Sequence, residues 1–294
     1  MVFVVPGPAE RGKALGSLAG LPPLLERAFT ADFHFEPVPQ PARLDWLGIA
    51  RERGQSFERF TQVVSNVPGR DRRLYIQPVG EWGVEDADLL QRVRQFGIAF
   101  FARDVDVRSP LPIADGMRTR RNRFTDVLQV NSRDLLAALA AAVPADACGV
   151  LAVTAHDLYP HDTWSFVFGE AIVDERVGVF SIARYDPRFY DKPADPLLRL
   201  ARVCKVFAHE TCHMLGLRHC VFFNCLMNGS NHLAESDRRP LHLCPIDLRK
   251  LQWSLRFDVV ERYERLLAFW RTVGLHAEAD WIERRLTFIL ESRI

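Results

Sequence analysis

The stretch of sequence that decides the fold is HETCHMLGLRH, at residues 209–219. It closes a run with apolar residues at helical spacing, which begins after Pro196 and stops at Gly216. The length of the run and its terminating glycine predict a helix. His209 and His213 are four residues apart, so they lie on one face of that helix and both imidazoles can point at the same atom. This arrangement suits two neutral imidazoles on a zinc ion.

Three more residues of the stretch extend the pattern. Glu210 lies to one side of the histidine pair and can take a proton from a water molecule on the metal. Gly216 can turn left-handed and end the helix, which brings His219 within reach as a third ligand. Two histidines alone could be a solvated pair, but five specified residues at fixed spacing arise by chance on the order of once in ten thousand such chains. The stretch therefore predicts a catalytic zinc site.

The residues after His219 carry a resemblance to a known group. HExxHxxGxxH followed by a methionine turn is the metzincin signature. The continuation through Cys220, Cys225, Met227 and Cys244 is similar to the archaemetzincins, which place a Cys after the third His, a second five residues on, a Met two residues later and a downstream CxxC. The strong resemblance covers residues 209–247, with a weaker likeness over 157–185.

This resemblance implies an α+β, metzincin-like zinc peptidase. Its parts would be a twisted mixed β-sheet with a backing helix and an active-site helix, a small loop-rich lower subdomain after Gly216, and a helical C-terminal extension. Met227 would form the apolar floor beneath the zinc, a role that is compatible with a plain core methionine. The implied activity is peptide-bond hydrolysis, with an aminopeptidase-like mode on short peptides. In metzincins an edge strand pairs with extended substrate, and residues 177–185 (VGVFSIARY) are the candidate strand here.

The resemblance also implies a second, structural zinc. In archaemetzincins four cysteines are expected to hold it, and this sequence has Cys220, Cys225 and Cys244 with Asp247 at the fourth position. A carboxylate oxygen can replace a thiolate on zinc, although it should bind less tightly because thiolate is the softer ligand.

Asp247 has an alternative interpretation as a helix-start residue. With Cys244 as the cap and Pro245 as the first helical residue, Asp247 falls in the first turn, where the helix dipole favours a negative charge. Both roles can coexist. His242, Asp237 or water could serve as the fourth ligand instead.

Changes in the pattern of apolar and turn residues along the chain predict three domains. Residues 1–95 form an N-terminal extension packed on the catalytic unit, 96–255 the catalytic domain, and 256–294 a C-terminal helical extension. Apolar periodicity predicts helices at 86–97, 132–143 with a start signal at Ser132, 261–274 and 277–290, and strands at 97–107, 149–159, 166–173 and 177–185.

Composition limits the function classes. The chain has 38 Lys+Arg against 37 Asp+Glu, so no global field favours nucleic acid or an anionic membrane, and the RTRRNR run at 118–123 is interpreted as a solvated loop. The opening residues lack a positively charged region before the apolar start, and Pro6 and Pro8 interrupt it, so we expect an intracellular protein and, by default, a monomer. Clustered cysteines then favour metal over disulfides.

Smaller features and other function classes carry less weight. Cys204 and Cys212 are expected to be small buried residues, and His232 and His242 to be solvated. The alternatives to a peptidase are a catalytically weak zinc-stabilised binding protein and a zinc-ribbon-like adaptor built on the three clustered cysteines. An intact Glu210 favours the peptidase, since a binding module has no need of that carboxylate.

Overall fold

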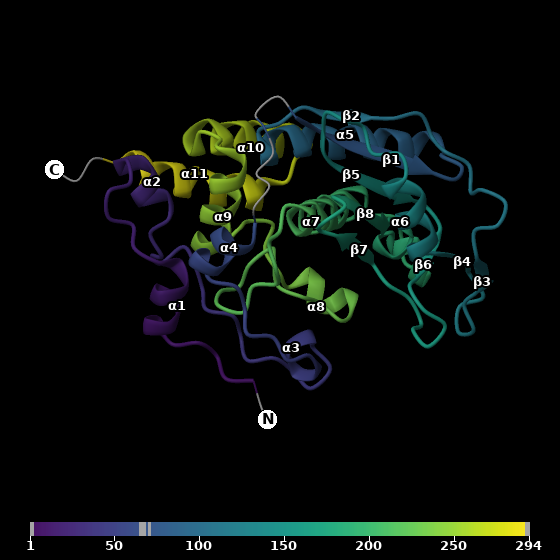
Figure 1. Cartoon of the computed structure of the whole chain (residues 1–294), viewed down its shortest axis with the longest axis horizontal. Coiled ribbons are helices and arrows are strands. Elements are labelled where there is room, and N and C mark those ends of the chain that lie inside the picture. The colour runs from purple at the N-terminus through teal and green to yellow at the C-terminus, as the bar shows by residue number, and fades with distance from the viewer. Residues whose placement is uncertain (1–2, 65–68, 70–71, 292–294) are drawn as a thin grey trace. The chain divides into compact units, whose positions relative to one another are not determined.

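The computed structural model describes residues 3–64, 69 and 72–291 (Figure 1). The chain divides into two compact units. We call residues 69–215 the sheet unit, and residues 1–68 with 216–294 the helical unit. The three domains expected from the sequence, with limits at 95/96 and 255/256, stay a prediction about folding units.

A five-stranded mixed sheet forms the centre of the sheet unit, in the order β2-β1-β5-β8-β7. Its strands are β1 (Arg73–Val79), β2 (Val105–Val107), β5 (Ala147–Thr154), β7 (Gly169–Ile172) and β8 (Val177–Ser181). All neighbouring pairs are parallel except β7 with β8, which is antiparallel. A second, three-stranded sheet consists of β3 (Thr119–Arg121), β4 (Leu128–Asn131) and β6 (Asp157–Tyr159). The mixed sheet confirms the fold class expected from the resemblance.

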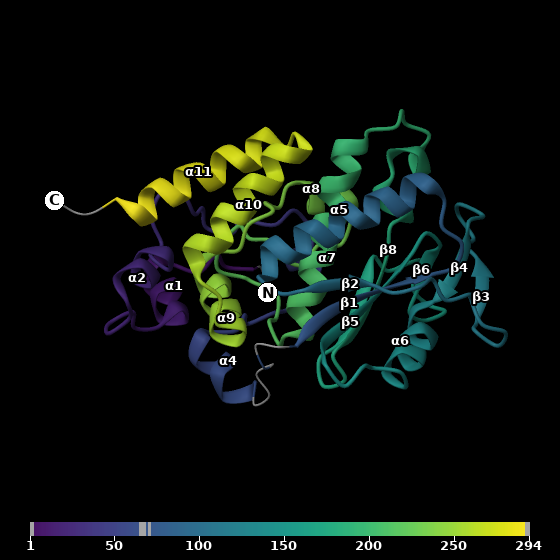
Figure 2. The ribbon, with the colours of Figure 1, turned by 90° about the horizontal axis from the view of Figure 1, so that it is seen from above.

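Helices cover both faces of the five-stranded sheet (Figure 2). On one face α6 (Ser132–Ala140) packs against Val150 and Val179, and on the other lie α5 (Val84–Phe101) and α7 (Pro196–Met214). All residues of β5 and β8 are therefore buried, which explains their nearly continuous apolar sequences.

Glycines on the sheet let α7 lie close to it. A Cβ at Gly149 would come 3.1 Å from Met214 Cε, and one at Gly178 would come 3.3 Å from Met214 Sδ. Helix α7 is thus held directly against β5 and β8.

The predicted substrate strand at 177–185 is wrong as an edge strand. Residues 177–181 form β8, which pairs with β5 on one side and β7 on the other, and 183–185 form a 3₁₀ turn. The two strands predicted at 166–173 and 177–185 pair as the antiparallel strands β7 and β8, so within the part of the chain that the structure describes β7 is the strand at this edge of the sheet.

The strand predicted at 97–107 is wrong over its first half, which is helix. Helix α5 continues to Phe101, and only Val105–Val107 form a strand. The helical spacing of buried Val93, Phe96 and Phe100 runs on through the apolar residues, so the pattern was interpreted with the wrong period. Gly97 is tolerated inside the helix because Phe207 of α7 packs there, where a Cβ would lie 2.8 Å from its ring.

The single strand predicted at 149–159 is divided between β5 and β6, which belong to different sheets, and the remaining predicted elements of the sheet unit are confirmed. Helix α6 includes Ser132, but its cap is Asn131, whose side chain accepts hydrogen bonds from the backbone N–H groups of Arg133 and Asp134. Helix α7 ends one residue before Leu215, and Gly216 has the expected left-handed φ of 88°.

Helices dominate the helical unit. They are α1 (Pro8–Leu15), α2 (Pro23–Ala28), α3 (Trp46–Ile49), α4 (Phe57–Val63), α8 (Leu233–Asp237), α9 (Pro245–Leu255), α10 (Val259–Val273) and α11 (His276–Leu290). The predicted C-terminal helices α10 and α11 lie side by side (Figure 1). Buried Arg285 of α11 donates hydrogen bonds to the carbonyls of Ala28 and Thr30, which joins the N-terminal segment to the C-terminal helices.

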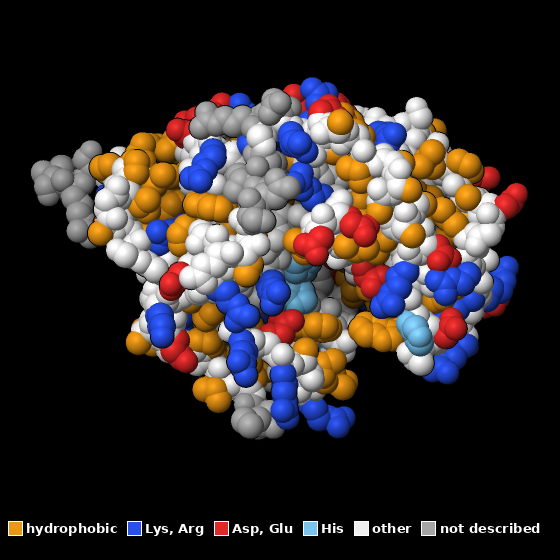
Figure 3. Space-filling view, viewed as in Figure 1, with side chains coloured by type: hydrophobic (Ala, Val, Ile, Leu, Met, Phe, Trp, Pro, Cys, Tyr) orange, Lys and Arg blue, Asp and Glu red, His pale blue; other side chains and the backbone are white. Residues whose placement is uncertain are grey.

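The RTRRNR run is solvated as expected at Arg118, Arg121 and Arg123, which are exposed, but its centre is a strand and not a loop. Residues 119–121 form β3, Arg118 pairs with Asp134 at 2.7 Å, and Arg120 lies over the ring of Tyr159. On the face shown in Figure 3, basic and acidic side chains intermingle, as the balanced composition predicts.

Among the described residues, no helix has the length and apolar character that crossing a membrane requires. The intracellular location and the monomeric state stay predictions.

Candidate metal centres

Helix α7 brings two histidines together. It begins at Pro196 with Asp195 as its cap, whose side chain accepts a hydrogen bond from the backbone N–H of Leu198 at 2.9 Å. Near its end, His209 Nε2 and His213 Nε2 lie 3.0 Å apart, with their rings nearly perpendicular. Two nitrogens that each lie about 2.0–2.1 Å from one zinc must be within about 4 Å of each other, so this pair fits a shared zinc ion.

Glu210 presents its carboxyl group beside the edge strand β7. A Cβ at Gly169 of β7 would come 2.9 Å from Glu210 Cδ and Oε1, so only a glycine leaves room for the carboxyl there. Burial raises the pKa of Glu210 to about 8, and the negative charge of Glu170 adds to the rise. A buried carboxyl group with a raised pKa, next to a histidine pair, is typical of a proton-transfer group.

The third predicted ligand, His219, belongs to the helical unit, because the boundary between the units falls at Gly216. Its Nδ1 lies 2.8 Å from Glu52 Oε1, and the ring of Trp46 meets the His219 ring edge to face. With Nδ1 held by Glu52, Nε2 is the ring nitrogen that can bind a metal. Sequence reasoning missed Glu52, which is separated from His219 by 167 positions and carries no local signal.

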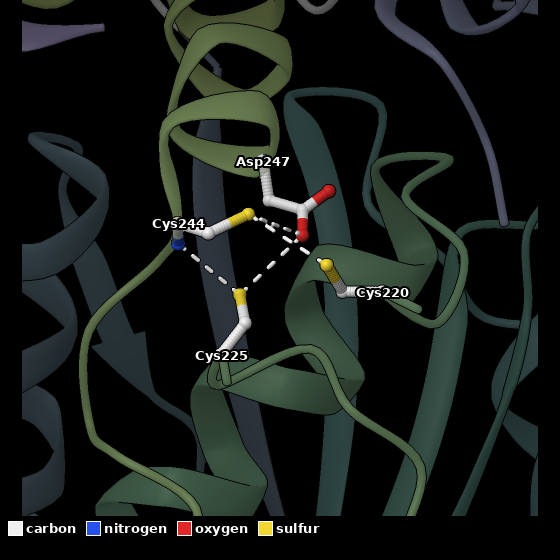
Figure 4. A group of neighbouring side chains, drawn as sticks. All are labelled: Cys220, Cys225, Cys244 and Asp247. Carbon is white, nitrogen blue, oxygen red and sulfur yellow. Dashed lines mark hydrogen bonds between the residues drawn. The ribbon is translucent and has the colours of Figure 1, made fainter. Parts of the chain in front are cut away.

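Three cysteines and an aspartate form a second group, entirely within the helical unit (Figure 4). Cys220 and Cys225 lie in the loop after α7, Cys244 is the N-cap residue of α9, and Asp247 lies in its first turn. One ligand atom from each of the four lies within 4.8 Å of all the others, and all four residues are at most 2% exposed.

Asp247 divides its two carboxylate oxygens between two tasks. Oδ2 lies 3.4 Å from Cys225 Sγ and 3.3 Å from Cys244 Sγ, whereas Oδ1 is 2.8 Å from the buried Lys250 Nζ. Burial raises the pKa of Asp247 to about 6, and Lys250 opposes that rise. The helix-start interpretation is confirmed in position, and the same geometry directs one oxygen at the thiols.

Burial also raises the pKa values of the Cys225 and Cys244 thiols above their usual range. Such thiols stay protonated unless a cation stabilises their thiolates. Three sulfurs and one carboxylate oxygen in a closed space are a donor set that zinc accepts.

The other suggested fourth ligands lie elsewhere. His242 is not solvated as expected, because its ring stacks on Trp281 with 3.7 Å between centroids, and desolvation lowers its pKa to about 3. Asp237 is an exposed residue at the end of α8. Cys204 and Cys212 are buried in α7, as predicted.

A third group, formed by Asp45, His232 and Glu235, is held by arginines. Arg238 pairs with Asp45 at 2.8 Å, and Arg239 pairs with Glu235 at the same distance. Because an arginine already neutralises each carboxylate, this group holds its segments together without needing a metal.

Comparisons with known proteins show which family the chain resembles. The model of peptidase family M54 matches residues 134–253. Archaemetzincin-2 of Macaca fascicularis is 37% identical over 282 residues, which span 85% of this chain and 78% of the relative. Archaemetzincin-1 of Homo sapiens is 36% identical over 262 residues, or 78% of this chain and 52% of the relative. The crystal structure of archaemetzincin from Methanopyrus kandleri, 27% identical, superposes with a TM-score of 0.52 and covers 65% of this chain and 100% of that chain.

Proposed function

This chain belongs to the archaemetzincin family of zinc metallopeptidases, and on that premise we propose that it hydrolyses peptide bonds at a zinc ion bound by His209, His213 and His219, with Glu210 as the general base. The observation that carries the proposal is the pair of Nε2 atoms 3.0 Å apart on α7, with the buried Glu210 adjoining it. Gly216, with its left-handed φ, makes the turn that leads from α7 toward His219.

Each residue of the site has a distinct task in this proposal. Zinc bound there would polarise the scissile carbonyl and make a water molecule more acidic. Glu210 accepts the proton of the attacking water and later returns it to the leaving amine. Gly169 leaves room for the Glu210 carboxyl group, because any side chain at position 169 would collide with that carboxyl group. Met227, which is 0% exposed, contributes packing and no ligand.

An extended substrate would pair with β7. Strand β7 is the antiparallel strand at the edge of the sheet, and its Gly169 adjoins the Glu210 carboxyl. Backbone pairing at such an edge holds a peptide through its main chain and leaves side-chain preference to neighbouring surfaces. Aminopeptidase-like action on short peptides is the finer form of the proposal.

The direct test replaces Glu210 by Gln and by Ala and measures hydrolysis of a panel of short peptides with free and blocked N-termini. We expect rates to fall about 10²- to 10⁴-fold, as for loss of a general base, with the zinc content unchanged. Glu175→Gln, in the exposed turn between β7 and β8, is the matched control and should keep full activity. Retained hydrolysis in Glu210→Ala would overturn the assignment, and an inactive wild type would favour a zinc-stabilised binding protein.

We also propose that Cys220, Cys225, Cys244 and Asp247 hold a second, structural zinc. The burial of all four residues and the orientation of Asp247 Oδ2 toward two sulfurs support this. Lys250 on Oδ1 leaves Oδ2 as the oxygen for the metal and offsets part of the negative charge of the donor set.

The test of the fourth ligand is competition of Asp247→Ala with a chromophoric chelator. We expect zinc to leave this variant faster than it leaves the wild type. Asp258→Ala is the control. Asp258 is also an aspartate at a helix start, where it caps α10, but it does not belong to the cysteine group. Zinc held as firmly in Asp247→Ala as in the wild type would show that the aspartate only starts α9.

A further inference from the structure

Glu52 makes a specific contact with the third histidine of the catalytic motif. Its Oε1 lies 2.8 Å from His219 Nδ1, and the two side chains are 25% and 22% exposed. Glu52 lies in the segment between α3 and α4, far from the motif in sequence. A pair at this distance and degree of burial is better shielded from water than an ordinary surface ion pair.

The segment around Glu52 is built onto the turn that carries His219. Buried Gln55 donates from Nε2 to the Gly216 carbonyl at 3.1 Å, and its Oε1 accepts the backbone N–H of Arg218 at 3.1 Å. Gly54 has a φ of 68°, and a Cβ there would come 2.6 Å from Val221 Cγ2. Residues 52–55 therefore bind the backbone just before His219 through Gln55 and pack against the Val221 side chain just after it.

The chemistry of a metal-binding imidazole gives this contact a meaning. A neutral histidine that binds through Nε2 carries its proton on Nδ1, and an acceptor at Nδ1 selects that tautomer. A carboxylate acceptor also fixes the ring orientation and makes the ligand more basic. The edge-to-face contact of Trp46 with the His219 ring, 5.4 Å between centroids, restricts ring rotation further.

We propose that Glu52 is a positioning residue of the catalytic metal centre: it accepts a hydrogen bond from Nδ1–H of His219 so that Nε2 serves as the zinc ligand, while Gln55 holds the turn. The N-terminal extension then contributes, through Glu52 and Gln55, to holding a zinc ligand in place. This inference rests on the proposed zinc ligation by His219 and gives a role to residues that the catalytic motif leaves unexplained.

The experiment measures zinc affinity of the whole chain by chelator competition for wild type, Glu52→Leu and Glu52→Ala, both of which remove the acceptor oxygens. We expect binding at the catalytic site to weaken about 10- to 100-fold, the usual cost of removing such a partner. The second zinc should be unaffected. Substituted Co²⁺ should show a changed visible spectrum at the catalytic site, which a merely structural role for Glu52 would leave as in the wild type.

Controls separate this inference from the proposal beneath it. Glu58→Gln, at an exposed position of the nearby α4, should bind zinc as the wild type does. If His213→Ala loses one zinc but neither Glu52 variant changes affinity or the Co²⁺ spectrum, the positioning role is wrong and the peptidase site stands. If His213→Ala and His219→Ala keep all their zinc, the proposed function itself fails. Glu52→Leu removes the acceptor oxygens while it keeps most of the side-chain volume, so it decides the matter even if Glu52→Ala does not fold.

Discussion

The histidine pair on α7 and the cysteine group at the start of α9 differ in how they meet solvent. His209 and His213 are partly exposed, whereas Cys225, Cys244 and Asp247 are 0% exposed. A catalytic zinc needs an open coordination position, and a structural zinc is closed by four protein ligands. The difference in exposure supports the proposal that the first site carries turnover and the second maintains the fold.

The surroundings of the two groups reinforce this division. Beside the histidines lies the Glu210 carboxyl group, which can carry a proton. Beside the cysteines lies the buried Lys250, which forms an ion pair with Asp247. Asn228 ties the cysteine loop together by donating to the carbonyls of Cys220 and Phe223. These contacts hold the four side chains in fixed positions, which suits a metal that keeps the same ligands.

The largest contrast should appear on treatment with 1,10-phenanthroline. Because the histidine site is open, the chelator should remove its zinc and abolish hydrolysis while one zinc per chain remains. Activity and metal content are followed together over time, and hydrolysis should return on addition of Zn²⁺. Simultaneous loss of both metals would show that the two sites are equally accessible.

A second contrast concerns stability. Cys225→Ser should lose the closed site, and its free energy of unfolding should fall by about 4 kcal/mol where free zinc is about a thousandfold above the dissociation constant. Denaturant unfolding with and without zinc measures this, and the zinc-dependent part should vanish in metal-free protein. Cys204→Ser is the control, since that buried thiol belongs to neither group. An equal zinc-dependent loss in Cys204→Ser would break the distinction.

The smallest of these effects is expected from Gly169→Ala. The added methyl group would meet the Glu210 carboxyl and the Val179 carbonyl at 2.9 Å, so the proton acceptor should be displaced. We expect hydrolysis to fall on the order of 10- to 100-fold, as for small misplacements of catalytic groups, with both zincs retained. Gly12→Ala, which meets no atom within 4 Å, should leave hydrolysis unchanged. Wild-type activity in Gly169→Ala would remove the argument for close contact between β7 and the base.

The parts of the molecule that sequence could predict are those governed by local pattern. Helix α7, its glycine stop, the β7–β8 hairpin and the position of Asp247 in α9 follow from spacing and capping residues. The strand predicted at 97–107 failed because an apolar run fits either period, and the packing of Phe207 against Gly97 decided for helix.

Contacts between distant segments could not be predicted. Residues 177–185 were predicted as the edge strand, but β7 lies at the edge instead. Which strand lies at an edge depends on the order of strands in the sheet, and the local sequence does not reveal that order. The pairing of Glu52 with His219 joins segments 167 positions apart and is created only by the tertiary fold. Lys250 was within reach of sequence analysis, because a lysine three residues after Asp247 on one helix lies beside it.

The central claim is that this chain holds two zinc ions at independent sites. Metal content of the purified protein, measured for the wild type, His213→Ala, Cys225→Ser and the double variant, tests it most directly. The account predicts two zincs, one, one and none, with hydrolysis lost in His213→Ala. A wild type with a single zinc that is lost only with His213, or two zincs that are lost together in either variant, would contradict it.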